Sequence, residues 1–170
     1  MNADDYRRLS AAARSRDGGV RLRAVDRICV AAVALSYALA LVWLAVAGDA
    51  RLAAVFLAPA TGFVVLSLVR RALNRPRPYE VLDIEPLLDA STKGSSFPSR
   101  HVSSGALIAV ALACVEPLWG IGVGVLTALL AWVRVKGGVH WPADVLAGLG
   151  AGALWAVAAL ALCAQCGLAL

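Results

Sequence analysis

Charged side chains are scarce in this sequence. Asp, Glu, Lys and Arg make up 16% of its 170 residues, and hydrophobic residues make up 61%, whereas a typical soluble domain carries about 25% charged residues. A small soluble globule needs polar side chains to cover its large relative surface, and a disordered chain is poor in apolar residues. The composition therefore excludes both classes and favours one compact membrane domain.

Long apolar segments predict five membrane-spanning helices, because a span needs about 20 mostly apolar residues. These segments are 28–47, 52–69, 102–115, 118–133 and 143–170. The third is the shortest and needs the preceding turn to reach spanning length. The predicted fold class is therefore all-α, a polytopic membrane helical bundle that occupies residues 28–170.

The first 23 residues lack the features of a secretory signal peptide, since no early apolar stretch and no small-residue cleavage site precede the first span. They are rich in aspartate and arginine instead. This composition predicts a polar interfacial helix at the lipid surface, and a mobile tail is an equally good interpretation. Residues 1–27 are expected to form a segment distinct from the membrane domain.

Cysteine and glycine patterns point to packing rather than chemistry. Cys163 and Cys166 have the spacing of a redox or metal pair, but no second pair and no nearby histidine accompany them. Buried cysteine usually acts as a small hydrophobe. Small residues four apart let helices approach closely in lipid. Close helix packing is expected at Gly120, Gly122, Gly124, Gly148 and Gly152.

Positive charge is distributed unevenly along the chain. With five alternating spans, the N-terminus, the connection 70–100 and the link 134–142 lie on one side of the bilayer. That side holds both histidines and 15 of the 16 Lys and Arg residues, and only Arg51 lies opposite. The net charge of +5 is then explained by phosphate-binding arginines and a membrane-side tail. No nucleic-acid partner is expected, and function should be sought on the basic face.

Three polar clusters lie on this face, at 70–79, 93–101 and 134–144. Ionisable residues near membrane depth are costly and usually functional. Arginine binds phosphate oxygens bidentately and stays charged at any working pH, and the helix start after Ser99 offers free backbone N–H groups. Together the clusters predict a phosphate site with a histidine beside it.

The two histidines suggest nucleophilic chemistry at that site. Asp144 follows His140 by four residues, so its carboxylate can reach a ring N–H and fix the tautomer. An imidazole with a free nitrogen facing phosphorus is a nucleophile, and His101 can protonate the departing oxygen. Each piece has a structural alternative, since a basic run is often a topology signal or a contact to anionic lipid. Arg71 and Arg75 are interpreted in this second way.

The clusters resemble the signature of the type 2 phosphatidic acid phosphatases (PAP2), a superfamily that includes the vanadium haloperoxidases. That signature is K-x6-R-P, then P-S-G-H, then S-R-x5-H-x3-D. The matching segments are Arg70-x6-Arg77-Pro78, Pro98-Ser99-Arg100-His101 and Val133-Arg134-x5-His140-x3-Asp144, in the same order and spacing. The resemblance covers roughly residues 50–165.

The resemblance implies a role for each matching residue. His140 would be the nucleophile that forms a phosphohistidine, Asp144 would orient it, and His101 would act as the acid and later activate water. The phosphoryl group would be held by Arg70, Arg77, Arg134, Ser99 and the backbone N–H of Arg100. The resemblance also implies that neither a metal nor another cofactor is needed.

Three residues depart from the signature. Arg70 replaces the usual lysine, Arg100 the usual glycine, and Val133 the usual serine, which removes one hydroxyl group. None of these changes deletes the histidine–aspartate pair. Many relatives have six spans rather than five, and the segment 1–23 could replace the missing helix as an interfacial one.

The predicted function is an integral-membrane phosphatase for a lipid phosphate or diphosphate. The substrate would be of the phosphatidic acid, phosphatidylglycerol phosphate or polyprenyl phosphate class, and the location a bacterial inner membrane. A non-catalytic phospholipid-binding or transport protein of the same fold is the alternative. A haloperoxidase is disfavoured, because those relatives are soluble and larger. The resemblance implies a site outside the cytoplasm, whereas the seven arginines up to Arg27 favour a cytoplasmic site. The sequence therefore does not decide which side of the membrane carries the site.

Overall fold

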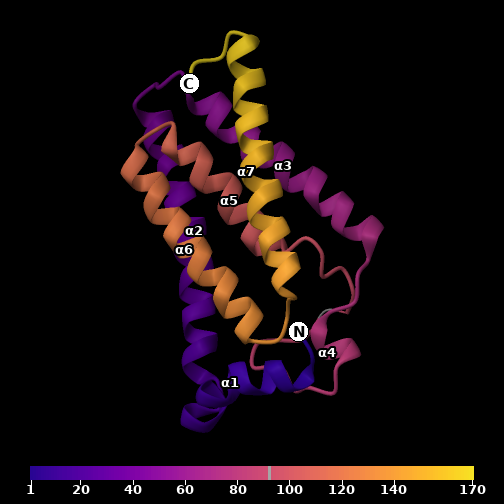
Figure 1. The fold of residues 1–170 in the computed structure, drawn as a ribbon. Coiled ribbons are helices and arrows are strands. Elements are labelled where there is room, and N and C mark those ends of the chain that lie inside the picture. The colour runs from indigo at the N-terminus through magenta and orange to yellow at the C-terminus, as the bar shows by residue number, and fades with distance from the viewer. Residues whose placement is uncertain (92) are drawn as a thin grey trace.

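The computed structural model describes residues 1–91 and 93–170, and helices account for nearly all of the regular structure in this part of the chain. The helices are α1 (Ala3–Asp17), α2 (Val20–Val46), α3 (Leu52–Leu73), α4 (Pro78–Val81), α5 (Arg100–Ala113), α6 (Pro117–Lys136) and α7 (Pro142–Gln165). Figure 1 shows the long helices running side by side, with α1 and α4 at one end of the bundle and the C-terminus at the other.

Helix α5 lies at the centre of the bundle and packs against α2, α3, α6 and α7 (Figure 1). The four surrounding helices are long and apolar enough to cross a membrane. With its 14 residues, α5 extends about 21 Å at about 1.5 Å per residue, which is shorter than a bilayer core of about 30 Å. The preceding turn does not lengthen it, because Ser99 has an extended backbone and the residues before it form a loop. The all-helical membrane fold is confirmed, with α5 as a short central helix.

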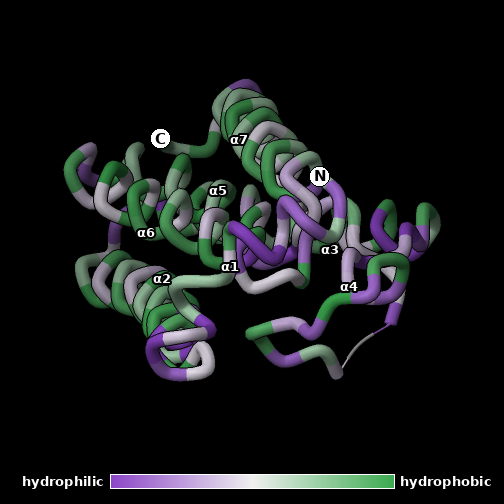
Figure 2. The backbone as a smooth tube through the Cα atoms, turned by 60° about the horizontal axis from the view of Figure 1, so that its bottom comes forward, coloured by the Kyte–Doolittle hydropathy of each residue, from purple (hydrophilic) through white to green (hydrophobic). Residues whose placement is uncertain are grey.

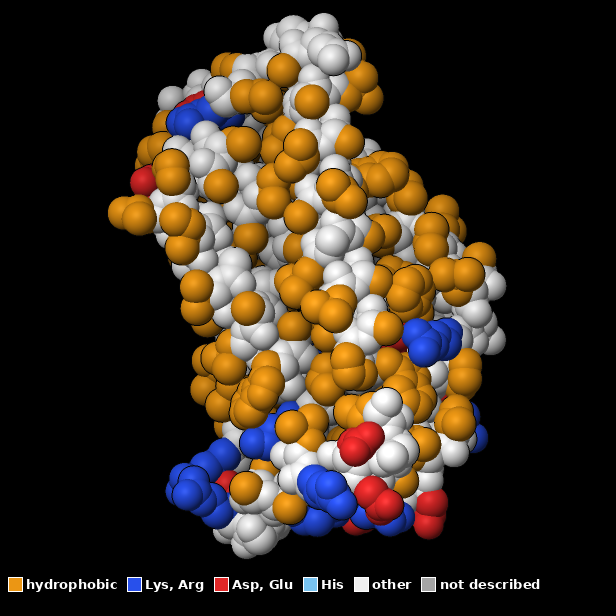
Figure 3. Space-filling view, viewed as in Figure 1, with side chains coloured by type: hydrophobic (Ala, Val, Ile, Leu, Met, Phe, Trp, Pro, Cys, Tyr) orange, Lys and Arg blue, Asp and Glu red, His pale blue; other side chains and the backbone are white. Residues whose placement is uncertain are grey.

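The outer surfaces of the four long helices are apolar. Large hydrophobic side chains are exposed along each of them, including Leu39, Phe63, Val125 and Leu154. Figure 3 shows these side chains covering the body of the molecule, while charged side chains gather mainly at the end that carries α1 and α4. Contiguous exposed apolar surface of this extent is typical of a lipid-facing protein. The chain is therefore an integral membrane protein.

At the basic end of the bundle, α1 lies across the ends of the bundle helices (Figure 2). The residues of α1 form a capped helix rather than a tail, and Tyr6 is buried against Gly138. Arg14 forms an ion pair with Glu85 at 2.9 Å, which ties α1 to the loop that follows α4. Helix α2 begins at Val20, so the predicted boundary at residue 28 falls inside it.

Close packing of α5 against α7 depends on two of the expected glycines. A Cβ atom added at Gly148 would lie 3.0 Å from a backbone oxygen just before α5. A Cβ atom added at Gly152 would lie 2.5 Å from a backbone oxygen within α5. Gly120 packs in the same way against the end of α5. The expectation is wrong for Gly122 and Gly124, whose Cβ positions meet no other atom within 4 Å. This close approach brings the N-terminal ends of α5 and α7 together.

Candidate active site

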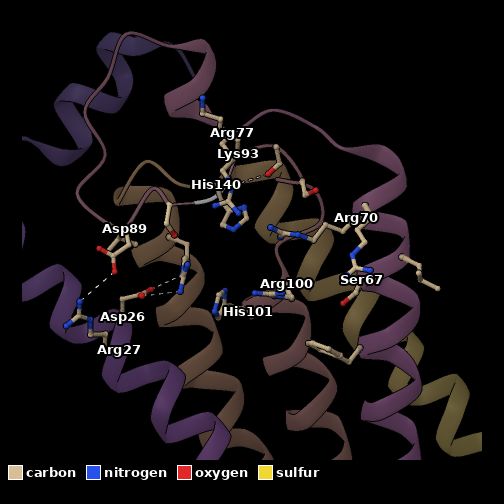
Figure 4. Close-up of a pocket in the computed structure, with 18 of the residues that line it drawn as sticks. Asp26, Arg27, Ser67, Arg70, Arg77, Asp89, Lys93, Arg100, His101 and His140 are labelled. Atoms are coloured by element: carbon tan, nitrogen blue, oxygen red, sulfur yellow. Dashed lines mark hydrogen bonds and ion pairs between the residues drawn. The ribbon is translucent and has the colours of Figure 1, made fainter.

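A cavity of about 680 Å³ opens at the basic end of the bundle, between α2, α3, α5 and the link from α6 to α7. Figure 4 shows both histidines beside it, with arginines approaching from several elements. Its walls contain the cationic residues Arg23, Arg27, Arg70, Arg71, Arg77, Lys93, Arg100 and Arg134, together with Asp26 and Asp89. The three sequence clusters therefore meet in one place.

His140 and Asp144 form a buried pair at the wall of this cavity. His140 is 1% exposed and Asp144 is fully buried. The Nδ1 atom of His140 lies 3.5 Å from Oδ2 of Asp144, as the spacing of four residues predicts. Because Nδ1 faces the carboxylate, Nε2 is the nitrogen available to the cavity. This distance is long for a hydrogen bond.

The start of α7 holds Asp144 in place. The backbone N–H of Trp141 donates to the Asp144 carboxylate at 2.9 Å, and the N–H of Ser99 donates to the Asp144 backbone carbonyl at 2.9 Å. A carboxylate in the first turn of a helix also interacts favourably with the helix dipole. The second contact joins the starts of α5 and α7, so the two histidine-bearing segments are fixed relative to each other.

Two residues that bind Asp144 are not among the predicted site residues. The hydroxyl of Ser96 donates to Oδ2 of Asp144, and its oxygen also lies 3.4 Å from Nδ1 of His140. Nη1 of Arg75 lies 3.1 Å from Oδ1 of Asp144. The interpretation of Arg75 as a topology signal or lipid contact is thus corrected, because its charge is directed at the buried carboxylate. Their positions inside the polar clusters 70–79 and 93–101 were the available signal.

Arg75 is oriented by aromatic rings as well as by charge. Its guanidinium carbon lies 5.9 Å from the ring centre of Phe97 and 5.8 Å from that of Trp141. Both separations fall within the range of cation–π attraction. The indole N–H of Trp141 donates to the carbonyl of Pro76, which keeps the ring beside the arginine.

Burial lowers the pKa of His140 to about 4, because the enclosed site disfavours the charged imidazolium. The Asp144 carboxylate opposes this shift, while the positive charge of Arg77 adds to it. His140 is therefore neutral at physiological pH. A neutral imidazole keeps the lone pair that nucleophilic attack requires.

The start of α5 places His101 and Arg100 beside the cavity (Figure 4). From α3, Nη1 of Arg70 donates to the Pro98 carbonyl at 3.2 Å, so the arginine spans the loop before α5 and also lines the cavity. Ser99 is fully buried, and its hydroxyl has no hydrogen-bond partner among the described residues. Its backbone N–H is already occupied by the Asp144 carbonyl. Arg70, Arg100 and His101 line the cavity, whereas Ser99 does not.

Arg77 and Arg134 reach the cavity from fixed positions. Arg77 is buried and donates to the carbonyls of Gly94 and Val139, which joins the loops that lead into α5 and α7. Arg134 forms an ion pair with Asp26 of α2, in which Nη2 donates to Oδ2 at 3.0 Å and Nε lies 2.8 Å from Oδ1 without hydrogen-bond geometry. Asp26 is absent from the predicted site, although a carboxylate beside an apolar span was a signal for it.

The loop before α5 is shaped by two side chains from earlier in the chain. Asn74 ends α3 in a left-handed conformation with φ of 38°. The oxygen of its side-chain amide, Oδ1, accepts from the backbone N–H of Ser95 at 3.1 Å. Glu80 of α4 accepts from the N–H of Gly94 at 2.9 Å and from that of Arg77 at 2.7 Å. These hydrogen bonds hold the end of α3 and the helix α4 to the backbone of the loop before α5.

The structure accounts for two departures from the family signature. Residue 100 begins α5 and has no positive φ, so its backbone conformation does not require glycine. Val133 is fully buried and packs with Leu22, Leu87 and Val139. Position 133 therefore faces the hydrophobic core, where a hydroxyl group would lack a charged phosphate partner.

The fold and this site define a class: a polytopic helical membrane protein with a cationic cavity around a buried histidine–aspartate pair and a second histidine. Comparison with known sequences agrees with this description. The chain belongs to the PAP2 superfamily, whose family profile matches residues 50–166.

Individual relatives resemble parts of the chain. It is 31% identical over 109 residues to a lipid A 1-phosphatase of Rhizobium johnstonii, a match that covers 62% of this chain and 45% of the relative. It is 37% identical over 73 residues to an undecaprenyl-diphosphatase of Sulfolobus acidocaldarius, covering 42% of this chain and 35% of the relative. The matches span less than half the length of either relative.

A solved structure shares the fold. The crystal structure of LpxE from Aquifex aeolicus superposes with a TM-score of 0.73 over 94% of both chains, at 23% sequence identity. At this identity the likeness concerns the fold. It extends over nearly the whole chain, including parts that lie outside the family match.

Proposed function

We propose that this protein is a bacterial inner-membrane phosphatase that hydrolyses a lipid phosphate or diphosphate through a phosphohistidine, without a metal ion. One observation carries the proposal: the buried Asp144 holds Nδ1 of a neutral His140, which leaves Nε2 to face a cavity lined with arginines. The family membership and the names of the two relatives, which act on lipid A and on undecaprenyl diphosphate, support the same class of reaction.

The proposed reaction has two steps. Nε2 of His140 attacks phosphorus, the bond from phosphorus to the leaving oxygen breaks, and His101 gives a proton to that oxygen. Asp144 stabilises the positive ring of the phosphohistidine. Water then attacks phosphorus, His101 takes the water proton, and phosphate leaves while His140 returns to its neutral form.

The arginines have a separate task in this proposal. Negative charge grows on the phosphoryl oxygens in the transition state, and positive groups that are already oriented stabilise it without reorganisation. Arg70 and Arg77 are held by backbone carbonyls, and Arg134 is held by Asp26. The backbone N–H of Arg100 would complete the phosphate site at the start of α5.

Phosphate release from purified lipid phosphates tests the proposal. The full chain in detergent micelles would be assayed with phosphatidic acid, phosphatidylglycerol phosphate, farnesyl phosphate and farnesyl diphosphate, with and without EDTA. We expect EDTA-resistant release that falls at least about 1000-fold in His140→Ala, as for loss of a nucleophile in a catalytic triad. Arg21→Gln is the matched control, because Arg21 is highly exposed and lies outside the cavity.

The covalent intermediate offers a second test. In His101→Ala the water step is slowed, so acid-labile phosphate should accumulate on the protein, and the double variant with His140→Ala should carry none. Full release by His140→Ala, or a requirement for metal ions, would contradict the proposed mechanism. The alternative, a non-catalytic lipid-binding protein, predicts equal lipid-phosphate binding by both proteins and release by neither.

A further inference from the structure

Arg100 is a cation with no negative partner in the part of the chain that the structure describes. It occupies the position at which the family signature has glycine, and its side chain lies beside His101 on the cavity wall (Figure 4). Arg70, Arg134 and His101 lie within electrostatic range of Arg100, and both arginines are cations. A guanidinium placed among other guanidinium groups is stabilised when an anion enters.

Ser67 supplies a second donor from the neighbouring helix α3. Its hydroxyl is buried and has no hydrogen-bond partner among the described residues, and the residue lines the cavity from α3. Figure 4 shows Ser67 and Arg100 on facing helices at the same side of the cavity. A buried hydroxyl without a partner is costly, so the Ser67 hydroxyl is free to donate to a ligand oxygen in this part of the cavity.

The charge balance of the cavity exceeds what one phosphate neutralises. Among the residues that the structure describes, eight cationic side chains and two carboxylates line it, an excess of six positive charges before the histidines are counted. The carboxylates are already paired, Asp26 with Arg134 and Asp89 with Arg27. A phosphomonoester carries about −1.5 to −2 charges. A headgroup with a second phosphate matches the cavity better than a single phosphate does.

The cavity also has a lipid-facing side. Phe63 and Val64 line it from α3, and both are exposed on the outer apolar surface of the bundle. Ser67 is one turn further along the same helix. A substrate whose tail lies in the membrane beside Phe63 would therefore pass Ser67 and Arg100 before its headgroup reaches His140.

We propose that Arg100 and Ser67 form a second phosphate subsite, which makes the preferred substrate a lipid whose headgroup carries two phosphates. The terminal phosphate is the one attacked by His140, and the inner phosphate, nearer the lipid tail, accepts from Arg100 and Ser67. This inference rests on the proposed phosphatase function. The inner phosphate can be part of a diphosphate, or it can be a phosphodiester separated from the terminal phosphate by a short polyol.

Two pairs of substrates with matched tails test the subsite. Farnesyl diphosphate is compared with farnesyl phosphate, and phosphatidylglycerol phosphate with phosphatidic acid. We expect the wild-type kcat/KM to be at least about 10-fold higher for the two-phosphate member of one pair, since a charged hydrogen bond is worth about that factor. The pair with the larger ratio identifies the source of the second phosphate.

Substitutions then assign the preference to the two residues. Arg100→Gln is expected to lower the ratio about 10-fold by raising KM for the two-phosphate substrate, with Arg100→Lys retaining part of it and Ser67→Ala lowering it about 3-fold. Inorganic diphosphate should inhibit wild type more strongly than inorganic phosphate, and Arg100→Gln should reduce that difference. Arg21→Gln controls for loss of an arginine elsewhere, and its ratio should equal that of wild type.

The results separate the inference from the proposed function. Equal activity of wild type on both members of each pair, or an equal loss on both in Arg100→Gln, would overturn the second subsite while leaving the phosphatase intact. Absence of phosphate release from every substrate would contradict the phosphatase function itself. Retention of the ratio in both Arg100→Gln and Ser67→Ala would show that other residues read the headgroup.

Discussion

Arg75 provides the sharpest test of how the site is held together. It contacts neither histidine, and its link to the chemistry is the 3.1 Å ion pair with Asp144. Replacement by glutamine removes the charge and the two cation–π contacts while retaining a polar side chain of moderate length. If Arg75 is a positioning residue, the variant will bind substrate normally and turn it over more slowly.

The expected magnitude follows from the exposure of the pair. Asp144 is fully buried, whereas the Arg75 side chain is 43% exposed, so solvent weakens the interaction. A pair of this kind lies between an exposed ion pair, about 0–1 kcal/mol, and a charged hydrogen bond, about 1.5–3 kcal/mol. A loss of about 1–2 kcal/mol corresponds to a fall in kcat of about 5- to 30-fold. Ser96 and the Trp141 N–H still hold Asp144, which limits the loss.

The assay is steady-state phosphate release with kcat and KM determined separately. Asp144→Asn is the reference for complete failure of the pair, with an expected fall in kcat of about 1000- to 10000-fold. Arg75→Lys should recover part of the loss, because it restores the charge but not the planar group between the rings. A change in KM alone would refute the reasoning by placing Arg75 on the substrate. An unchanged kcat would refute it as well.

Three further predictions concern the titration of the nucleophile, the support of an arginine and the packing of α5. In His101→Asn protein labelled with ¹³C-histidine, the remaining imidazole signal belongs to His140. It should titrate near pH 4, because burial holds the pKa of His140 below the usual 6.5. The nucleophile is thus neutral above about pH 5, and its lone pair is lost to protonation as the pH falls through 4. Asp26→Asn should lower kcat/KM about 10-fold, or about 1.4 kcal/mol, because Arg134 loses the charge of its ion-pair partner. Gly152→Ala should lower the thermal stability by about 1–3 kcal/mol, as its Cβ would meet a backbone oxygen of α5 at 2.5 Å.

Each of these has a control in the same chain. An imidazole midpoint at or above pH 6.5 would contradict the buried, neutral nucleophile. Asp17→Asn is the control for Asp26, since it removes a carboxylate of the neighbouring turn that lies outside the catalytic cavity, and an equal loss in both variants would show a nonspecific effect. Gly150→Ala has open space around its Cβ on the same helix, so a similar loss of stability there would contradict the packing argument.

Local features of the sequence were sufficient for the spans and for most of the site. A run of apolar residues specifies a membrane helix without reference to the rest of the chain, and α2, α3, α6 and α7 meet that expectation. The spacing of four residues between His140 and Asp144 likewise places both groups together by local geometry alone. The limits of α2 and α5 were less predictable, because each depends on where a loop is held by distant residues.

The tertiary structure decided the contacts between residues far apart in sequence. Asp144 meets Arg75 and Ser96 across 69 and 48 residues, and Arg134 meets Asp26 across 108. No periodic pattern encodes such pairs, because they form only when the helices and loops that carry them have packed together. The sequence by itself determined a helical membrane protein with histidines and arginines on one face. Only the packed structure decided which of those arginines face the cavity and which orient the residues around it. The reason is that the partners of each arginine are set by how the helices and loops pack.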